Sequence, residues 1–515
     1  MSSNPSSPPL VIVSLPGRTA EALRLQLALA SRGGADLVEI RLDRLAPGEF
    51  KRLERVHDLP LTHPWIPAVG TLRSRAEGGE GPDDPAERAR ILRQALELFP
   101  FSYLDLEIAR DEPLRDSFRQ DEGRPLGLVG SAHLPAGEVD RALDLLPQAL
   151  EGYDLAKIVC RASATEILAK VLPTLEGFRD RPYIFHTLGG AGSLLRVLSR
   201  RLGMEWTFAS LPETAPGTGS SSRVEPSQIP SDHLRRYLVG DANAPWYTIV
   251  GRPLGHTLSP FYQNVFLEAT ETRGLYVGWE PEEGEDVGGV LRKLTAFGLA
   301  GVNVTRPFKQ TLLPLVTEAD AEVQESGAVN TLVFPSPGAV RGYNTDVLAL
   351  EKRLREGKEQ GLWDGSEALV VGTGGSARAA LTAARRLGAK LFVHGRNSEH
   401  AAALVREGPG AGGTSRRTGE LRPFPLLVHC TPVGQSEPLG TPPALGAALA
   451  PGSWVLDLVY RPRIPWLAEL AHRAGARYED GTRILLYQAR ESFEHFTGRE
   501  LADASFEALL PEAGA

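Results

Sequence analysis

Ala368-Leu-Val-Val-Gly-Thr-Gly-Gly-Ser-Ala-Arg378 is a short apolar run that leads directly into a glycine-rich turn. The apolar run predicts a buried strand, and the following residues, Ala377–Leu387, predict a helix. Glycines let a phosphate approach the backbone closely, and a helix N-terminus favours that negative charge. The turn therefore predicts a dinucleotide site, and a tight turn without a ligand is the alternative. The candidate contacts are Gly372, Gly374, Gly375, Ser376 and Ala377.

The next strand indicates which dinucleotide this would be. The run Lys390–His394 ends in Gly395-Arg396-Asn397-Ser398, without an acidic residue. An acidic residue there would accept a ribose 2′-hydroxyl, whereas an arginine offers a cation to a 2′-phosphate. Arg396 and Asn397 therefore favour NADP over NAD, and a solvated loop arginine is the alternative.

The N-terminal part of the chain alternates β-rich runs with amphipathic helical stretches. Eight strand-then-helix units of this length match an α/β fold of the (β/α)8 barrel type, and an open parallel sheet is the alternative. The expected strands are Leu10–Leu15, Asp36–Asp43, Ile66–Arg73, Tyr103–Ile108, Leu126–His133, Leu155–Cys160, Tyr183–Leu188 and Glu205–Ser210.

Polar residues close several of these runs. The carboxyl ends of barrel strands meet at one mouth, where such folds carry their catalytic groups. The residues expected at this mouth are Glu39, Arg41, Arg73, His133 and Lys157.

Length and composition limit the partners of the chain. A chain of 515 residues is too long for one hydrophobic core. Its net charge of −8 offers no basic surface to nucleic acid, and no apolar run is long enough to span a bilayer. The two cysteines, Cys160 and Cys430, show neither disulfide nor metal-ligand spacing. We expect a cytoplasmic protein without a metal site and without nucleic-acid or membrane partners.

Lys157 is the candidate nucleophile of the barrel. A lysine that is desolvated and close to another cation has a lowered pKa and attacks ketones. An ion pair with Asp154 or Glu39 would explain the same residue structurally. His133 is the candidate proton shuttle because imidazole titrates near neutral pH, and a histidine satisfied within the core is its alternative.

Together these residues resemble type I 3-dehydroquinate dehydratase, over roughly Leu10 to Leu238. The matching pieces are Glu39-Ile-Arg41-Leu-Asp43, Thr71-Leu-Arg73, Glu77-Gly78-Gly79, Ser131-Ala-His133, Lys157 and Arg196. The resemblance implies that Lys157 forms an imine with the C3 ketone of 3-dehydroquinate and that His133 moves the protons. It also implies that Glu77 orients or tunes His133.

The same resemblance implies how the substrate is held. Glu39, Arg41 and Arg73 would hold hydroxyl groups. The alternative is a structural bridge inside the barrel for Glu39 and Arg41, and a surface ion pair for Arg73 and for Arg196. Arg196 would pair with the carboxylate, for which a planar guanidinium is well suited.

Two features depart from the dehydratase pattern. Leu195 stands where the family has a serine, and the family's Ser-Ala-Pro-Gly-Gln loop is altered. One register of that loop places Gln228 over the substrate and the other places Thr218 there. We favour Gln228.

The region Tyr247 to Gly498 resembles shikimate dehydrogenase. The matching motifs, in family order, are Gly251-Arg-Pro-Leu-Gly-His-Thr257-Leu-Ser259-Pro260, Gly301-Val-Asn303-Val-Thr305-Arg-Pro-Phe-Lys309, Ala328-Val-Asn330-Thr331, Gly342-Tyr-Asn-Thr-Asp346, Asp457-Leu-Val-Tyr460-Arg-Pro462 and Gln488-Ala489. The resemblance implies that Lys309 and Asp346 are the catalytic pair. Alcohol oxidation needs a proton acceptor at the oxygen, which a lysine paired with a carboxylate can provide. Without the resemblance this pair would be an ordinary salt bridge.

The resemblance also implies the contacts of both ligands. Substrate contacts would be Thr257, Ser259, Asn303, Thr305, Asn330 and Gln488, and helix capping is the alternative for Thr257 and Ser259. Further cofactor contacts would be Thr431, Tyr460 and Gly481. The departures from the family pattern are Thr257 for serine, Val347 for glycine, His429 for asparagine, and His400 for a second basic residue near the 2′-phosphate.

These resemblances imply four segments and two activities. The segments are a disordered leader at residues 1–9, the barrel at 10–240, a substrate domain at 246–345 to which 485–515 return, and a Rossmann NADP domain at 346–484. The expected enzyme converts 3-dehydroquinate to 3-dehydroshikimate and reduces the product to shikimate with NADPH. The alternatives are a quinate or shikimate dehydrogenase that uses NAD, and a regulator that senses metabolites without turnover.

Overall fold

The N-terminal segment forms a parallel sheet of eight strands with helices between them. In this computed structural model the strands follow the hydrogen-bonded order β7-β6-β5-β4-β3-β2-β1-β8. The structure describes residues 7–57, 66–119, 126–213, 225–433, 444–461 and 465–510. The strands are β1 (Leu10–Leu15), β2 (Leu37–Arg41), β3 (Ala68–Thr71), β4 (Tyr103–Glu107), β5 (Gly127–Ala136), β6 (Leu155–Arg161), β7 (Tyr183–Leu188) and β8 (Trp206–Ala209).

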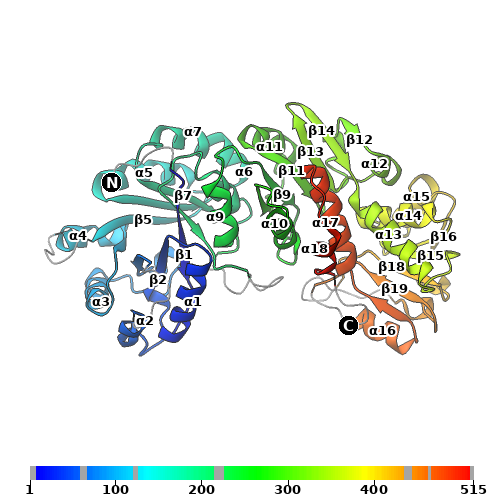
Figure 1. Cartoon of the computed structure of the whole chain (residues 1–515), viewed down its shortest axis with the longest axis horizontal. Coiled ribbons are helices and arrows are strands. Elements are labelled where there is room, and N and C mark those ends of the chain that lie inside the picture. Colours follow the sequence, from blue (N-terminus) through cyan, green and yellow to red (C-terminus); the bar gives the residue numbers. More distant parts are fainter. Residues whose placement is uncertain are drawn as a thin grey trace. The chain divides into compact units, whose positions relative to one another are not determined.

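Helices cover the outer face of this sheet (Figure 1). They are α1 (Ala20–Arg32), α2 (Glu54–His57), α3 (Pro85–Leu98), α4 (Ile108–Arg119), α5 (Val139–Gly152), α6 (Ala164–Glu166), α7 (Leu172–Leu175), α8 (Gly192–Leu198) and α9 (Ser231–Val239). The strands are therefore buried on both faces, which explains why they read as nearly continuous apolar runs. The predicted (β/α)8 fold is confirmed.

The two ends of the strand order, β7 and β8, are joined partly by side chains. The His186 Nε2 atom accepts a hydrogen bond from the Phe208 N–H at 3.2 Å. The Arg196 guanidinium donates to the Thr187 carbonyl on β7 and to the Phe208 carbonyl on β8, each at 3.2 Å. These two side chains satisfy backbone groups that a continuous ladder would pair with one another.

A second, mixed sheet has the order β10-β9-β11-β13-β14-β12. Its strands are β9 (Trp246–Val250), β10 (Leu275–Trp279), β11 (Leu299–Val304), β12 (Glu318–Ala319), β13 (Thr331–Ser336) and β14 (Ala339–Tyr343). Associated helices are α10 (Ser259–Ala269), α11 (Val287–Leu294), α12 (Ala321–Ser326), α17 (Thr482–Thr497) and α18 (Asp503–Glu507). Helix α17, near the C-terminus, lies against β11 and β13 (Figure 1).

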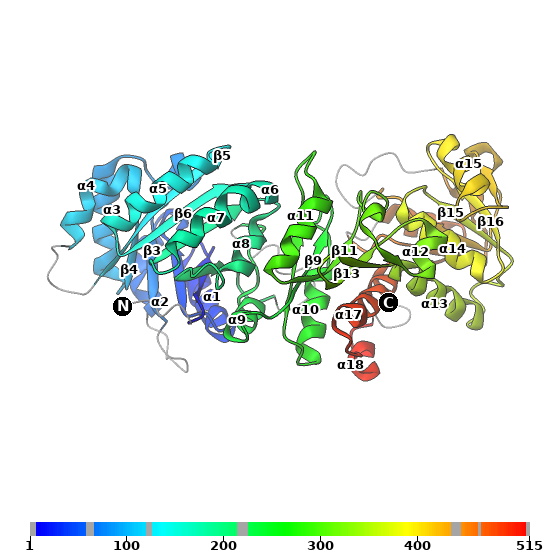
Figure 2. The same cartoon turned by 90° about the horizontal axis from the view of Figure 1, so that it is seen from above.

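The third sheet is parallel and has the order β17-β16-β15-β18-β19-β20. Its strands are β15 (Glu367–Val371), β16 (Lys390–His394), β17 (Thr414–Arg416), β18 (Leu426–His429), β19 (Trp454–Asp457) and β20 (Arg477–Glu479). The helices α13 (Thr345–Glu359), α14 (Gly375–Arg386) and α15 (Ser398–Glu407) accompany it (Figure 2), as does α16 (Pro465–Arg473) (Figure 1). The order reverses between β15 and β18, which is the place where open α/β sheets bind ligands.

The chain divides into two compact units. One comprises Met1–Trp246 with Arg273–Gly298, and the other Tyr247–Thr272 with Leu299–Ala515. Cys160 and Cys430 are both unpaired. None of the helices within the described ranges is long and apolar enough to cross a membrane.

Candidate active sites

Along each barrel strand, two successive inward-facing positions differ in polarity, the first being apolar and the second mostly polar. An apolar cluster fills one end of the barrel interior, with Tyr103 packed against residues such as Ile12, Leu37, Leu155 and Ile184. Successive side chains alternate between the faces of a strand, so the residue two positions later also points inward. These next inward positions, all buried, are Ser14, Glu39, Thr71, Asp105, Ser131, Lys157, His186 and Phe208. Strand periodicity thus places Lys157 in a ring of mostly polar groups.

Lys157 is held between two carboxylates. Its Nζ atom lies 2.9 Å from Glu39 Oε1 and 2.9 Å from Asp105 Oδ2. The same ammonium group stands 4.2 Å from the centre of the Phe208 ring. Of the two ion pairs considered from the sequence, the structure contains the one with Glu39, whereas Asp154 accepts the Leu128 N–H and pairs with Arg119. The lysine is desolvated, as expected, but its direct neighbours are anions.

Both carboxylates are poised to remain ionised. Burial by itself would raise the pKa of Glu39, but the charges of Lys157 and Arg41 bring it below its ordinary value. Burial also opposes ionisation of Asp105, and Arg73 together with Lys157 lowers its pKa strongly. Ser14 and Thr71 donate hydrogen bonds to Glu39 at 2.7 and 3.0 Å. The ring therefore combines buried cations and anions in close pairs.

Arg73 and Glu77 connect this ring to His133. The Arg73 guanidinium contacts Asp105 at 3.2 Å and Glu77 at 2.9 Å. Glu77 Oε2 accepts the backbone N–H of His133 at 3.0 Å and lies 3.5 Å from His133 Nδ1. Burial raises the pKa of Glu77 to about 7. Burial and the cations Arg73 and Lys157 hold the pKa of His133 well below its ordinary value, so its ring is neutral at neutral pH.

Arg41 and Gln228 occupy different surroundings. Arg41 forms two hydrogen bonds, at 2.8 and 2.7 Å, with the carboxylate of Asp43. That geometry corresponds to the structural bridge considered for Arg41. Gln228 is buried, whereas Thr218 lies outside the described residues.

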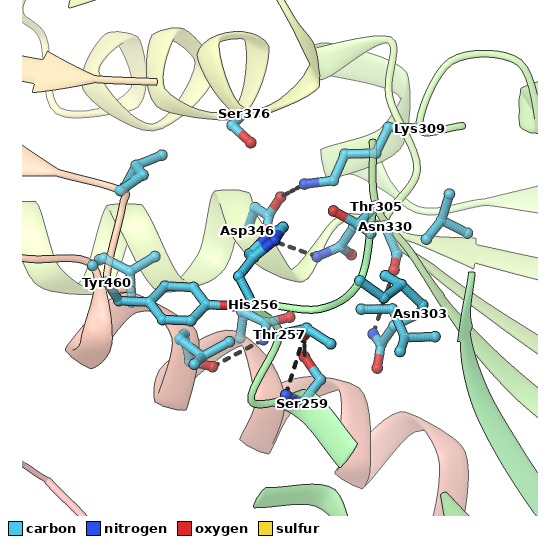
Figure 3. A pocket seen from close by; sticks show the side chains of 18 of the residues that line it. His256, Thr257, Ser259, Asn303, Thr305, Lys309, Asn330, Asp346, Ser376 and Tyr460 are labelled. Atoms are coloured by element: carbon cyan, nitrogen blue, oxygen red, sulfur yellow. Dashed lines mark hydrogen bonds and ion pairs between the residues drawn. The ribbon is translucent and has the colours of Figure 1, made fainter. Parts of the chain in front are cut away.

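The second half of the chain contains a pocket of about 830 Å³. Figure 3 shows polar side chains from several elements facing it, including Thr257, Ser259, Lys309 and Asp346. Every predicted substrate contact of this half lines the pocket, as do Ser376, Tyr460 and Gly481 of the predicted cofactor contacts. The structure thus brings together residues that are up to about 230 positions apart in sequence, from Thr257 to Gln488.

Lys309 and Asp346 form an ion pair in this pocket. Lys309 Nζ donates to Asp346 Oδ2, and Asn330 Nδ2 donates to Asp346 Oδ1 at 2.9 Å (Figure 3). Asp346 stands in the first turn of α13, where a helix N-terminus favours a negative charge. The carboxylate is therefore fixed on both oxygens, and its lysine faces the pocket.

The amides and hydroxyls around this pair are held by one another. Asn303 Nδ2 donates to Thr331 Oγ1 at 3.0 Å and to Ser492 Oγ at 2.9 Å. Thr257 Oγ1 donates to Ser259 Oγ at 3.2 Å and accepts the Ser259 N–H at 3.3 Å, so Thr257 also contributes to the start of α10. Gln488 Nε2 donates to the Leu485 carbonyl within α17. These contacts preorganise the groups that would meet substrate hydroxyls.

The glycine turn stands where the order of the third sheet reverses. Helix α14 begins at Gly375, two residues earlier than predicted, with Gly374 as its N-cap. A Cβ atom on Gly374 would meet no atom within 4 Å, whereas one on Gly372 would lie 3.1 Å from the Cys430 carbonyl. Gly372 also has a φ of 129°, which side chains disfavour. Open space before a helix N-terminus fits the phosphates of a dinucleotide.

Comparisons with known proteins agree with both family resemblances. The family model "Type I 3-dehydroquinase" matches residues 11–240, and the model "Shikimate dehydrogenase substrate binding domain" matches residues 249–332. A shikimate dehydrogenase (NADP(+)) of Halobacterium salinarum (strain ATCC 29341 / DSM 671 / R1) is 38% identical over 268 residues, which cover 51% of this chain and 97% of that protein. The chain belongs to the type I 3-dehydroquinase and shikimate dehydrogenase families.

One relative spans both families. The bifunctional 3-dehydroquinate dehydratase/shikimate dehydrogenase, chloroplastic, of Arabidopsis thaliana is 28% identical over 517 residues, 96% of this chain and 82% of that protein. Among solved structures, shikimate 5-dehydrogenase from Thermus thermophilus in complex with NADP(H) and shikimate is 29% identical. It covers 52% of this chain and 98% of its own, with a TM-score of 0.43.

In the dehydrogenase half, three further predicted nucleotide contacts differ in what surrounds them. Arg396 is exposed directly after β16, where it can reach a phosphate. Asn397 instead caps α15, because its Oδ1 atom accepts the Glu399 and His400 N–H groups at 2.9 and 3.1 Å. Thr431 follows β18, and its hydroxyl lies 2.6 Å from His429 Nε2, while His429 Nδ1 lies 2.8 Å from Asp457.

Gly375 has a second role that its motif did not reveal. A Cβ atom there would lie 2.8 Å from Lys309 Cδ. The glycine that the sequence assigns to the nucleotide therefore also leaves room for Lys309. No periodicity rule predicts this contact, because 66 residues separate the two positions.

The dehydratase half contains a functional residue that the sequence reasoning missed. Asp105 contacts Lys157, Arg73 and Ser131 in the centre of the barrel. The sequence contains an indication of this role for Asp105, since Tyr103-Leu-Asp-Leu-Glu107 carries two acidic residues within an apolar run. A carboxylate at an inward position of a buried strand must find a cation, and Lys157 and Arg73 are its cations.

Proposed function

We propose that this chain catalyses two consecutive reactions of the shikimate pathway. It dehydrates 3-dehydroquinate to 3-dehydroshikimate on Lys157, and it reduces that product to shikimate with NADPH beside Lys309 and Asp346. The observation that carries the proposal is one chain with two separate lysine–carboxylate sites, each surrounded by the polar residues that its family motif names.

The dehydration begins with proton transfer away from Lys157. An ammonium group cannot attack a carbonyl, so one proton must leave the nitrogen and is taken up by the ketone oxygen, which departs as water; Glu39 and Asp105 hold the nitrogen in place. The neutral amine adds to the C3 ketone, and loss of water gives an imine. The imine withdraws electrons from the neighbouring carbon and acidifies its C–H bond.

His133 then acts as the base. Its neutral ring takes the proton from that carbon and passes it to the hydroxyl on the next carbon, which leaves as water while a carbon–carbon double bond forms. Hydrolysis of the imine returns Lys157 and releases a conjugated ketone. The net change is the loss of one water molecule. Glu77 positions His133 through the backbone N–H that it accepts.

In the second site the residues of the chain hold the substrate oxygen and its proton. When bound, NADPH supplies the hydride that reduces the ketone. Lys309 provides the proton at the oxygen, and Asp346 keeps the ammonium group in place. The Gly372–Gly375 turn and the start of α14 would hold the diphosphate, and Arg396 the 2′-phosphate.

The pocket also provides selectivity. The amide of Asn330 and the hydroxyls of Thr257 and Ser259 line it. Analogues that lack the matching hydroxyl groups would leave these donors and acceptors unpaired and would therefore bind weakly.

The direct test follows NADPH absorbance with the purified chain. 3-Dehydroquinate is added to one sample and 3-dehydroshikimate to another. Absorbance should fall in both. A fall with 3-dehydroshikimate alone would contradict the proposed dehydratase activity. No fall in either sample would support a metabolite-sensing regulator instead.

Two finer features belong to the same proposal. We propose a cytoplasmic location, which the two unpaired cysteines favour, although the Arabidopsis relative is named chloroplastic. We also propose that residues 10–240, 246–345 with 485–515, and 346–484 form the three folded domains. Cell fractionation and limited proteolysis test these features.

A further inference from the structure

A carboxylate of the chain itself stands at the predicted carboxylate-binding arginine. Glu225 Oε2 lies 3.7 Å from Arg196 Nη2. Glu225 belongs to the altered loop, in the register that also contains Gln228. Its Oε1 atom accepts the Gly189 N–H at 3.2 Å, and its Oε2 atom accepts the Ser227 N–H at 2.8 Å. The side chain is therefore fixed against the guanidinium.

The other nitrogen atoms of Arg196 donate hydrogen bonds to backbone carbonyls of the barrel and to the Ser227 hydroxyl. Nε donates to the Phe208 carbonyl at 3.2 Å. Nη1 donates to the carbonyls of Thr187 and Gly192 and to Ser227 Oγ, at 3.2, 2.6 and 2.9 Å. Only Nη2 faces an anion in the contacts that the described residues form. An incoming carboxylate would thus meet the edge of Arg196 that Glu225 now faces.

Arg196 is close enough to Lys157 to share a substrate with it. Phe208 joins the two sites, since its carbonyl accepts from Arg196 and its ring lies over the Lys157 ammonium group. His186, which is bonded to the same Phe208, is influenced electrostatically by both cations. A small molecule with a ketone at Lys157 could therefore place a carboxylate at Arg196.

Burial explains why Arg196 needs an anion when no substrate is bound. The arginine side chain is only 3% exposed. Burial lowers the pKa of Arg196, and the negative charge of Glu225 opposes that change. A buried cation without a counterion is strongly destabilised. Glu225 supplies this counterion from a side chain that is 17% exposed.

We propose that Glu225 is an internal competitor for the substrate carboxylate at Arg196. The inference rests on the proposed dehydratase function. Two carboxylates cannot share one edge of a guanidinium without repulsion, so 3-dehydroquinate must displace Glu225 to bind. The competition weakens substrate binding and leaves the chemistry at Lys157 unchanged, so it raises KM rather than lowering kcat.

The test compares Glu225→Gln with the wild-type chain. Dehydration is followed by the ultraviolet absorbance of the conjugated ketone without NADPH, so that the second site does not turn over. The KM for 3-dehydroquinate should fall by about two- to fivefold, the range of a partly exposed ion pair, while kcat stays at the wild-type value. The wild-type kcat of dehydration verifies that the dehydratase half of the variant is folded, and shikimate oxidation by the same preparation verifies the other half.

Glu138→Gln is the matched control. It also removes one negative charge from the dehydratase half, but Glu138 pairs with Arg141, which is 66% exposed. Its KM should equal the wild-type value. A wild-type or higher KM in Glu225→Gln, with normal shikimate oxidation, would overturn the competitor role. If the wild-type chain itself produced no conjugated ketone, the proposed dehydratase function would fail, and the inference with it.

Discussion

The two lysines that we propose as catalytic differ in burial and in the number of carboxylates that contact them. Lys157 is almost completely buried and contacts two carboxylates, Glu39 and Asp105. Lys309 faces an open pocket and contacts one carboxylate, Asp346, whose side chain is 16% exposed.

The difference fits the different tasks of the two residues. A nucleophilic lysine must be held where the substrate ketone arrives, and two ionised carboxylates fix the Lys157 nitrogen from two sides. A lysine that delivers a proton needs room for the substrate oxygen beside it, and Lys309 has the pocket on that side. The two sites therefore differ in what surrounds the lysine, although both contain a lysine–carboxylate pair.

The largest expected effect comes from Lys157→Ala. Because no amine remains to form the imine, dehydration should fall by at least about 10³-fold. Shikimate oxidation should remain unchanged, since its site is in the other half of the chain. Lys170→Ala, which removes a surface lysine paired with Asp140, should alter neither activity. Loss of both activities in a folded Lys157→Ala chain would contradict two independent sites.

Lys309→Ala should give the reverse pattern. Shikimate oxidation should fall by roughly 10²- to 10⁴-fold, the usual contribution of a general acid or base, and dehydration should persist. Steady-state rates with each substrate measure both effects. Lys390→Ala, at an exposed position of the same half, is the control. Normal oxidation without Lys309 would show that another group moves the proton.

Arg396→Ala should change cofactor choice and leave the chemistry intact. Loss of a charge-assisted contact with the 2′-phosphate should raise the KM for NADP by roughly 10- to 100-fold and leave that for NAD nearly unchanged. The variant Arg406→Ala, which removes another exposed arginine of this region, controls for total charge. Equal changes for NADP and NAD would remove the assignment of Arg396.

The smallest expected effect is the pH dependence of dehydration, which we attribute to Glu77. Because burial raises its pKa from the ordinary 4.5 to about 7, Glu77 becomes ionised as the pH rises through neutrality. The ionised form stabilises a proton on His133, so dehydration kcat should rise severalfold through about pH 7. His133 cannot cause this rising limb of the pH profile, since its pKa lies well below its ordinary value.

Glu77→Gln tests this assignment. The limb should disappear, and the pH profile of shikimate oxidation should stay the same. The fold favours the protonated form of Glu77, so its contribution to stability is greatest below pH 4.5 and is lost as the pH rises through about 7. Thermal unfolding above pH 7 should therefore show Glu77→Gln to be more stable than the wild-type chain. A limb that persists in Glu77→Gln would assign it to another group.

Much of this fold could be predicted because its signals are local. The apolar runs of the barrel predicted all eight strands. Some were predicted up to two residues too long because polar mouth residues such as Arg73 follow the strands, whereas β5 continues three residues beyond its predicted end at His133. The glycine turn indicated the strand and helix at the centre of the third sheet. The structure shows in addition that Gly372 packs closely against Cys430. Period-two alternation even explains why Glu39 and Lys157 point inward.

What could not be predicted depends on contacts between distant residues. Asp105 becomes significant only when β4 and β6 bring it to Lys157. The bonds of Arg196 across β7 and β8 depend on where the sheet order ends, and its ion pair with Glu225 depends on the conformation of the loop. Sequence spacing identifies candidate residues, but it does not show which partner each one meets.

The contrast between the two lysines is tested most directly by borohydride reduction with 3-dehydroquinate present, followed by peptide mass mapping. Borohydride converts an imine into a stable amine, so a nucleophilic lysine retains the carbon skeleton of its ligand. We predict that Lys157 carries the adduct and that Lys309 remains unmodified. An adduct on Lys309, or an actively dehydrating chain without an adduct on Lys157, would contradict this account.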